Sequence, residues 1–172
     1  TKKAFWNVSV PGCNEHYFVH TMRQHPDFVP ELDLVLEREG KIIASVLYTH
    51  SWLEDQAGNR HRILTFGPLS VHPACQRKGY GKALEESFRR AKALGYDVIV
   101  IFGNPDNYVS RGFRSCKRYN VCLEGDIFPT ALLVKELTPG TLNSRKLCYR
   151  ESTAAACCED AEAVAAFDAQ FP

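Results

Sequence analysis

The 172-residue sequence lacks a long apolar run, a strong excess of charge and any regular spacing of cysteines. No stretch approaches the roughly 20 apolar residues that a membrane-spanning helix needs, and no signal peptide opens the chain. The formal net charge is +1, and the basic residues are dispersed along the sequence. The sequence therefore predicts a protein that binds neither nucleic acid nor a membrane.

The seven cysteines also lack the spacing of a metal site, because none forms a Cys-x-x-Cys pair. We therefore expect no metal. An odd, irregular set of cysteines is typical of free thiols in a reducing compartment, which predicts a cytoplasmic protein. The adjacent Cys157 and Cys158 are either a redox pair or, more simply, two small apolar residues of a helix. The full set is Cys13, Cys75, Cys116, Cys122, Cys148, Cys157 and Cys158.

The sequence does contain enough apolar residues, 45%, for the core of one domain of ordinary size. Apolar runs bounded by turn residues predict strands, and apolar residues at helical spacing predict helices, which together indicate an α/β fold. The expected strands are residues 32–38, 41–52, 62–71, 97–102, 113–116, 130–136 and 146–150, with a hairpin turn at residues 39–40. The expected helices are residues 13–23, 79–94, 106–111 and 159–167, and residues 1–6 have the pattern of a helix end.

The most informative segment is residues 69–81, where an apolar strand ends and a long amphipathic helix begins after two glycines. Backbone N–H groups at a helix start have no partner within the helix and carry the positive end of its dipole. Gly79 and Gly81 would let a phosphate approach that backbone. An ordinary tight turn fits the local pattern equally well, and neither Gly-x-x-x-x-Gly-Lys-Ser/Thr nor a full Gly-x-Gly-x-x-Gly is present.

Three elements of the sequence resemble the GNAT N-acetyltransferase superfamily, in the family's order and at its usual separations. Residues 76–81, Gln-Arg-Lys-Gly-Tyr-Gly, resemble motif A, Gln/Arg-x-x-Gly-x-Gly/Ala. Residues 67–73 resemble the family's fourth strand, and Tyr108 to Phe113 resemble its Tyr-x-x-x-Gly-Phe element. A looser resemblance extends over residues 33–137.

The resemblance implies a GNAT fold, in which a central mixed, mostly antiparallel sheet is splayed at a bulge and flanked by helices. Because residues 1–6 already have the pattern of a helix end, we expect the family's first strand to be absent from the given sequence, whose natural start would then lie upstream. We assign the GNAT domain to residues 1–137 and expect residues 138–172 to be an extension packed on it. That extension covers the mouth of the site, packs on the sheet or forms a homodimer contact, and the sequence does not choose among these.

The resemblance also implies acetyl-CoA as co-substrate. Gly67 and Pro68 predict a bulge that moves this strand away from the strand at residues 97–102. Backbone groups of residues 69–71 would then lack strand partners and pair with the amides of pantetheine, although an ordinary bulge without a ligand is the alternative. The residues expected to bind the cofactor are Leu69, Ser70, Val71, Gln76, Arg77, Lys78, Gly79, Tyr80, Gly81, Lys82 and Asn104.

The expected chemistry is attack of a neutral amine on the thioester, with a backbone N–H near Leu69 stabilising the oxyanion. Tyr108 matches the family's general-acid tyrosine in position and is the expected catalytic residue; a merely packed aromatic is the alternative. Asn104 and Asn107 either orient the cofactor or cap a helix, and capping is the simpler account.

The general base is not assigned by the sequence. Many GNAT enzymes carry a glutamate on the fourth strand, and Thr65 stands at the matching position. The other candidates are His50, Glu54, His61, Asp33 or a water held by Thr65.

We expect an N-acetyltransferase that acts on a small-molecule or peptide amine by direct transfer. Cys75 could be proposed as an acyl carrier, but an incidental residue of the loop is the simpler interpretation. Two alternatives stay open, a non-catalytic acyl-CoA-binding sensor or structural module, and an acyltransferase for a longer acyl chain.

Overall fold

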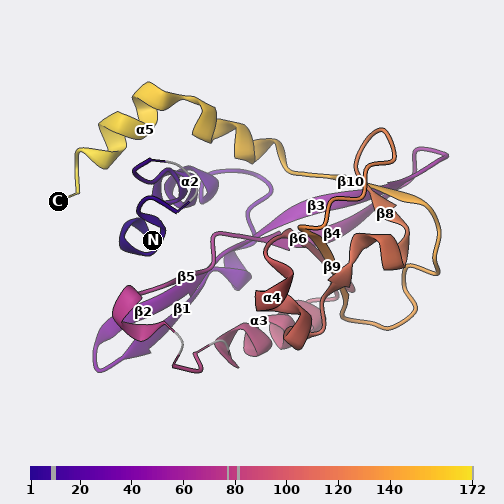
Figure 1. The fold of residues 1–172 in the computed structure, drawn as a ribbon, viewed down its shortest axis with the longest axis horizontal. Coiled ribbons are helices and arrows are strands. Elements are labelled where there is room, and N and C mark those ends of the chain that lie inside the picture. The colour runs from indigo at the N-terminus through magenta and orange to yellow at the C-terminus, as the bar shows by residue number, and fades with distance from the viewer. Residues whose placement is uncertain (9–10, 77, 81, 172) are drawn as a thin grey trace. The chain divides into compact units, whose positions relative to one another are not determined.

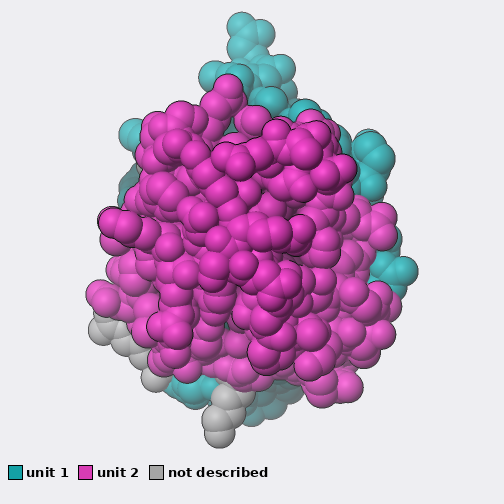
Figure 2. Space-filling view, turned by 90° about the vertical axis from the view of Figure 1, so that its right-hand side faces the viewer, with its two compact units in different colours: residues 1–48, 67–84, 152–172 teal, residues 49–66, 85–151 magenta. Residues whose placement is uncertain are grey.

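The computed structural model describes residues 1–8, 11–76, 78–80 and 82–171. The chain divides into two compact units, which Figure 2 shows in different colours. Unit 1 comprises Thr1–Tyr48, Gly67–Leu84 and Ser152–Pro172, and unit 2 comprises Thr49–Phe66 and Glu85–Glu151.

Unit 1 contains a three-stranded antiparallel sheet in the order β1-β2-β5 (Figure 1). The predicted hairpin is confirmed: Glu39 and Gly40 both have positive φ, 52° and 73°, as a two-residue type I′ turn requires. The strands are β1 (Leu34–Arg38), β2 (Lys41–Val46) and β5 (Ser70–Val71). The helices are α1 (Lys2–Phe5), α2 (Glu15–Met22) and α5 (Ala161–Asp168), with the 3-10 helices η1 (Pro30–Leu32), η2 (Pro73–Cys75) and η5 (Thr153–Glu159).

The last helix of unit 1 is tied to the first two, although they lie far apart in the sequence. Phe167 of α5 stacks on His20 of α2, with ring centroids 4.6 Å apart. Lys2 of α1 pairs with Asp168 of α5 at 3.0 Å. Unit 1 also has a small apolar cluster that joins α2 to η5 and comprises Met22, Leu47 and Ala154, packed by Phe18, Val19 and Phe28.

Unit 2 contains a seven-stranded mixed sheet in the order β7-β9-β6-β4-β3-β10-β8. β4 pairs in parallel with β6, and β10 pairs in parallel with β8, whereas β9 is antiparallel to both β6 and β7. The strands are β3 (Tyr48–Asp55), β4 (Arg60–Phe66), β6 (Val98–Phe102), β7 (Arg114–Ser115), β8 (Val121–Cys122), β9 (Leu132–Glu136) and β10 (Leu147–Arg150). The helices are α4 (Pro105–Tyr108), η3 (Val109–Arg111) and η4 (Cys116–Tyr119), while α3 (Lys82–Ala93) crosses from unit 1 into unit 2.

The core of unit 2 is built mainly from aliphatic side chains of the sheet and of the segments packed on it. β6 reads Val-Ile-Val-Ile-Phe, and its first four side chains are buried, as expected for a strand covered on both faces. The buried cluster comprises Leu53, Ile63, Val98, Val100, Cys116, Val121, Leu132, Val134, Leu142, Leu147 and Tyr149.

Three elements differ from the sequence-based expectations. The strand expected at residues 41–52 is two strands, β2 and β3, divided at Leu47, whose carbonyl accepts a hydrogen bond from the Gly67 N–H at 3.1 Å. The strand expected at residues 62–71 divides into β4 and β5, which belong to different sheets. β10, expected within an appended segment, lies inside the unit 2 sheet between β3 and β8 because Leu147 and Tyr149 are buried there. The domain boundary at residue 137 stays a prediction.

Within the described part of the chain, no helix has both the length and the apolar character that crossing a membrane demands.

Candidate active site

The break between β4 and β5 is the feature on which the candidate site depends. β4 pairs with β6, where Leu64 lies opposite Ile99, whereas β5 pairs with β2. Gly67 and Pro68 lie at the break, and proline has no N–H to donate to a ladder. The predicted departure of this strand from the strand at residues 97–102 is therefore confirmed.

β5 is an edge strand, and the direction of its backbone groups can be derived from one hydrogen bond. The His72 N–H donates to the Ile43 carbonyl at 2.8 Å. Because successive residues of an antiparallel strand point their backbone groups to opposite sides, Ser70 faces β2 and Val71 faces the open edge. The expectation that the Ser70 backbone has no strand partner is wrong, since Ser45 of β2 lies opposite it.

The loop after β5 is tied to that open edge. The Gln76 side-chain amide donates to the Val71 carbonyl at 3.2 Å. Gly79 has a φ of 81°, a left-handed conformation that favours glycine. The Tyr80 hydroxyl accepts a hydrogen bond from the Arg38 guanidinium at 2.7 Å. Of the other residues predicted to bind pyrophosphate, Lys78 is exposed, Lys82 begins α3, and Arg77 and Gly81 lie outside the described residues.

Tyr108 lies in unit 2, at the end of α4. Its ring packs between Phe66 and Phe113, with centroids 5.8 Å and 5.7 Å away. The ring also covers Gly103, where a Cβ would lie only 2.6 Å from Tyr108 Cε2. Burial raises the pKa of the Tyr108 phenol, which keeps it protonated and able to serve as an acid.

The Gly-Phe pair that follows Tyr108 holds it in place. Gly112 ends the helical segment with a φ of 86°, and the Phe113 N–H then donates to the Tyr108 carbonyl at 3.3 Å. Phe113 is fully buried against Phe66 and Phe88. The Tyr-x-x-x-Gly-Phe element is therefore a structural unit that fixes the tyrosine ring.

Asn104 is the N-cap of α4, where its side chain accepts a hydrogen bond from the Asp106 N–H at 3.0 Å. The capping interpretation is confirmed. Its role in cofactor binding stays a prediction, for which the side-chain NH₂ group supplies the donors.

Thr65, a candidate from the sequence for holding a catalytic water, belongs to a closed network of hydroxyl groups. Its hydroxyl donates to the Val100 carbonyl at 2.9 Å, and the hydroxyls of Ser51 and Tyr149 lie 2.8 Å and 2.7 Å from it. A hydroxyl has one proton and two lone pairs, and these three contacts use all of them. Thr65 therefore has no capacity left to hold a catalytic water.

The other candidate bases have surface partners. Glu54 pairs with Arg60 at 2.8 Å, which lowers its pKa. His61 pairs with Asp97 at 2.8 Å, and Asp33 of unit 1 pairs with Arg23 at 2.8 Å. His50 Nε2 lies 2.7 Å from the Tyr96 hydroxyl.

Sequence reasoning missed Glu151, which directly follows β10. Partial desolvation raises the pKa of the Glu151 carboxyl, although the residue as a whole is exposed at the surface. Its charge also acts on Tyr149, whose pKa is raised first by burial and then by this carboxylate. Glu151 is thus linked through Tyr149 to Thr65. No sequence motif includes Glu151. The strand before it, β10, was also expected to lie outside the central sheet, so the sequence offered no reason to consider this residue.

The described part of the chain offers no group of side chains suited to bind a metal ion. Among the residues that the structure describes, no three His, Cys, Asp or Glu side chains are arranged to hold a metal ion.

The family follows from a sequence comparison. Residues 3–115 match the model of the Acetyltransferase (GNAT) family. The chain therefore belongs to the GNAT acetyltransferases, as its three sequence elements predicted, and is an acyltransferase. No curated protein matched the sequence.

Solved structures with the same fold include two GNAT enzymes. One is the GNAT family N-acetyltransferase YhbS from Escherichia coli in complex with CoA, at a TM-score of 0.70 and 22% identity, covering 82% of this chain and 77% of that chain. The other is a GNAT family acetyltransferase from Brucella melitensis in complex with acetyl-CoA, at a TM-score of 0.69 and 20% identity, covering 90% and 86%. The predicted GNAT fold is confirmed.

Proposed function

We propose that the chain transfers an acetyl group from acetyl-CoA to a primary amine by direct attack within a ternary complex. The open edge of β5 carries this proposal, because an extended pantetheine arm can pair with it as an additional strand. The two solved structures of the same fold hold CoA or acetyl-CoA, which supports the same cofactor here.

Each predicted residue then has one task. Val71 pairs with the pantetheine arm, and backbone N–H groups of residues 77–82 bind the pyrophosphate at the start of α3. The N–H of Leu69 stabilises the oxyanion that forms when the amine attacks the thioester. Tyr108 donates a proton to the departing thiolate, whose basicity is comparable to that of a phenolate.

For the general base we propose Glu151, because it directly follows β10 in the sheet and its charge acts on Tyr149, whose hydroxyl contacts Thr65; its raised pKa is consistent with that role. Glu151→Gln should lower kcat by about 100-fold near neutral pH while leaving the KM for acetyl-CoA unchanged. The acid limb of the kcat–pH profile should lie above the pH expected for a glutamate with an unshifted pKa, since the base form exists only above the raised pKa. An unchanged limb in the variant would exclude Glu151.

Initial velocities test direct attack against an acyl-enzyme on Cys75. Direct attack predicts intersecting double-reciprocal lines when acetyl-CoA and the amine are both varied, and turnover within about twofold of wild type for Cys75→Ala. Parallel lines together with an inactive Cys75→Ala would establish the covalent route instead.

The alternative functions make different predictions. A non-catalytic acyl-CoA sensor binds acetyl-CoA without consuming it in the presence of any amine. An enzyme for longer acyl chains turns over such a thioester faster than acetyl-CoA. Cytoplasmic localisation and a homodimer stay predictions, which cell fractionation and the mass in solution would decide.

A further inference from the structure

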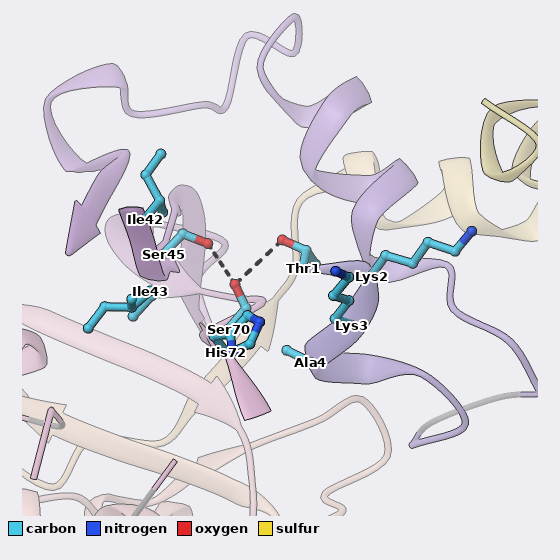
Figure 3. A pocket seen from close by; sticks show the side chains of 10 residues that line it. Thr1, Lys2, Lys3, Ala4, Ile42, Ile43, Ser45, Ser70 and His72 are labelled. Carbon is cyan, nitrogen blue, oxygen red and sulfur yellow. Dashed lines mark hydrogen bonds between the residues drawn. The ribbon is translucent and has the colours of Figure 1, made fainter. Parts of the chain in front are cut away.

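A small pocket in unit 1 lies against the side-chain face of β5, one residue from the proposed pantetheine edge (Figure 3). Its volume is about 190 Å³, the space of roughly six water molecules. Its described lining residues are Thr1, Lys2, Lys3, Ala4, Ile42, Ile43, Ala44, Ser45, Ser70 and His72.

Three hydroxyl groups form a chain along one wall of the pocket. The Ser70 hydroxyl lies 2.6 Å from that of Ser45 and 3.4 Å from that of Thr1, as the dashed lines in Figure 3 show. Ser70 is 4% exposed, so this polar group is buried at the pocket's inner end. The hydroxyls of Thr1, Ser45 and Ser70 have three protons, and the two hydrogen bonds among them use two. The third proton can be donated to a ligand.

Two further donors come from His72 and Lys3. His72 Nδ1 accepts the Ala74 N–H at 3.3 Å, so the proton of the neutral ring is on Nε2 and available. Lys3 has no ion pair among the described residues, and its side chain turns toward the Thr1 side of the pocket (Figure 3). Lys2, by contrast, extends away from the hydroxyls to Asp168.

The charges of the residues that line the pocket favour a negatively charged ligand. Among the described residues that line it, none is acidic, and Asp168 already neutralises Lys2. The remaining side-chain charge is one cation, Lys3, beside a set of donors. A cationic acceptor such as a polyamine would be repelled, whereas one carboxylate would pair with Lys3 and accept from the hydroxyl chain.

We propose that this pocket binds the carboxylate of the acceptor, so that the amine substrate is a small amino acid. This inference rests on the proposed acetyl transfer. Ala4 and the backbone of β2 at Ile43 and Ala44 line the pocket beside the hydroxyl groups, which leaves room only for a small acceptor. Ser70 contributes its side chain to the acceptor and precedes Val71, whose backbone faces the cofactor edge, so the two substrates meet on β5.

The test is a comparison of matched acceptors with the 172-residue chain: glycine against glycinamide, and β-alanine against 3-aminopropanamide. Each carboxylate should have a kcat/KM at least about tenfold above its amide, as a hydrogen bond to a charged group would give. An amide substituent lowers the pKa of the amine and enlarges its neutral fraction, so this preference cannot arise from the amine itself.

Variants of Lys3 test whether the preference for a carboxylate over its amide arises from this pocket. Lys3→Gln should bring the carboxylate-to-amide ratio close to one, Lys3→Arg should retain it, and Lys41→Gln, at an exposed lysine of β2 outside the pocket, should leave it unchanged. The KM for acetyl-CoA should not change. Equal use of acids and amides would overturn the inference, and so would a Lys3→Gln effect confined to acetyl-CoA, which would assign the pocket to a cofactor phosphate.

A binding measurement separates this inference from the proposed function. The chain has two tryptophans, Trp6 and Trp52, and Trp6 lies beside Lys2 and Lys3 in an adjoining pocket. In a Trp52→Phe background, glycine should change the Trp6 fluorescence, and Lys3→Gln should abolish the change. That result without turnover would refute acetyl transfer but keep the carboxylate site, whereas amine acetylation without glycine binding would refute the site alone.

Discussion

Tyr108→Phe should lower kcat by about 100- to 1,000-fold, the range of general acid catalysis, while the Kd of acetyl-CoA stays within about twofold. The ring of the variant packs on Gly103, Phe66 and Phe113 as the tyrosine does, and only the hydroxyl is lost. Steady-state kinetics and calorimetric titration of acetyl-CoA give the two values.

Gly103→Ala is the matched variant, because it leaves the hydroxyl in place and displaces the ring. A Cβ at this position would lie 2.6 Å from Tyr108 Cε2, so the ring must move. The kcat should fall in this variant too, with cofactor affinity preserved. Full activity in both variants would show that Tyr108 is only a packed aromatic, which was the alternative interpretation of the sequence.

Val71→Pro should raise the Kd of acetyl-CoA by about tenfold or more and leave the fold intact. Val71 faces the open edge of β5, so proline removes an N–H that no strand uses, and proline is tolerated at such edge positions. The pantetheine arm would lose its backbone donor. Titration of acetyl-CoA and thermal unfolding of the same preparation measure the two effects.

Ser70→Pro is the control one residue earlier. The Ser70 backbone faces β2, so proline there removes a donor of the β2–β5 ladder and should lower the melting temperature. Unchanged affinity in a folded Val71→Pro variant would show that the cofactor does not pair with this edge.

The fold could be predicted to a large extent from local patterns. The β1–β2 hairpin, the buried strand β6 and the amphipathic helix α3 each have a sequence signal that depends on neighbours along the chain. β8 was missed because a strand of two residues has too few positions for a period to show. β10 was expected as a strand, but its pairing with β3 and β8 has no signal along the chain. Their places are decided by burial of Val121, Leu147 and Tyr149 in the core.

Those parts of the candidate site could be predicted that depend on backbone conformation or on a short sequence motif. Gly67 and Pro68 indicated the break in the strand, and Tyr108 was found from its distance to Gly112 and Phe113. The proposed role of Glu151 depends on the contact of Tyr149 with Thr65, and that of the Ser45–Ser70–Thr1 hydroxyls on contacts between segments equally distant in sequence. No spacing along the chain records such contacts, so the sequence alone left the base and the acceptor open.

The most direct measurement of the central claim is the release of CoA thiol from acetyl-CoA with and without amino acids, followed by mass spectrometry of the amine. We predict that release depends on the amine, and that the amine gains one acetyl group for each thiol released. Tight binding of acetyl-CoA with no release in the presence of any amine would contradict the account and indicate a sensor. Release at the same rate without an amine would indicate hydrolysis and contradict it equally.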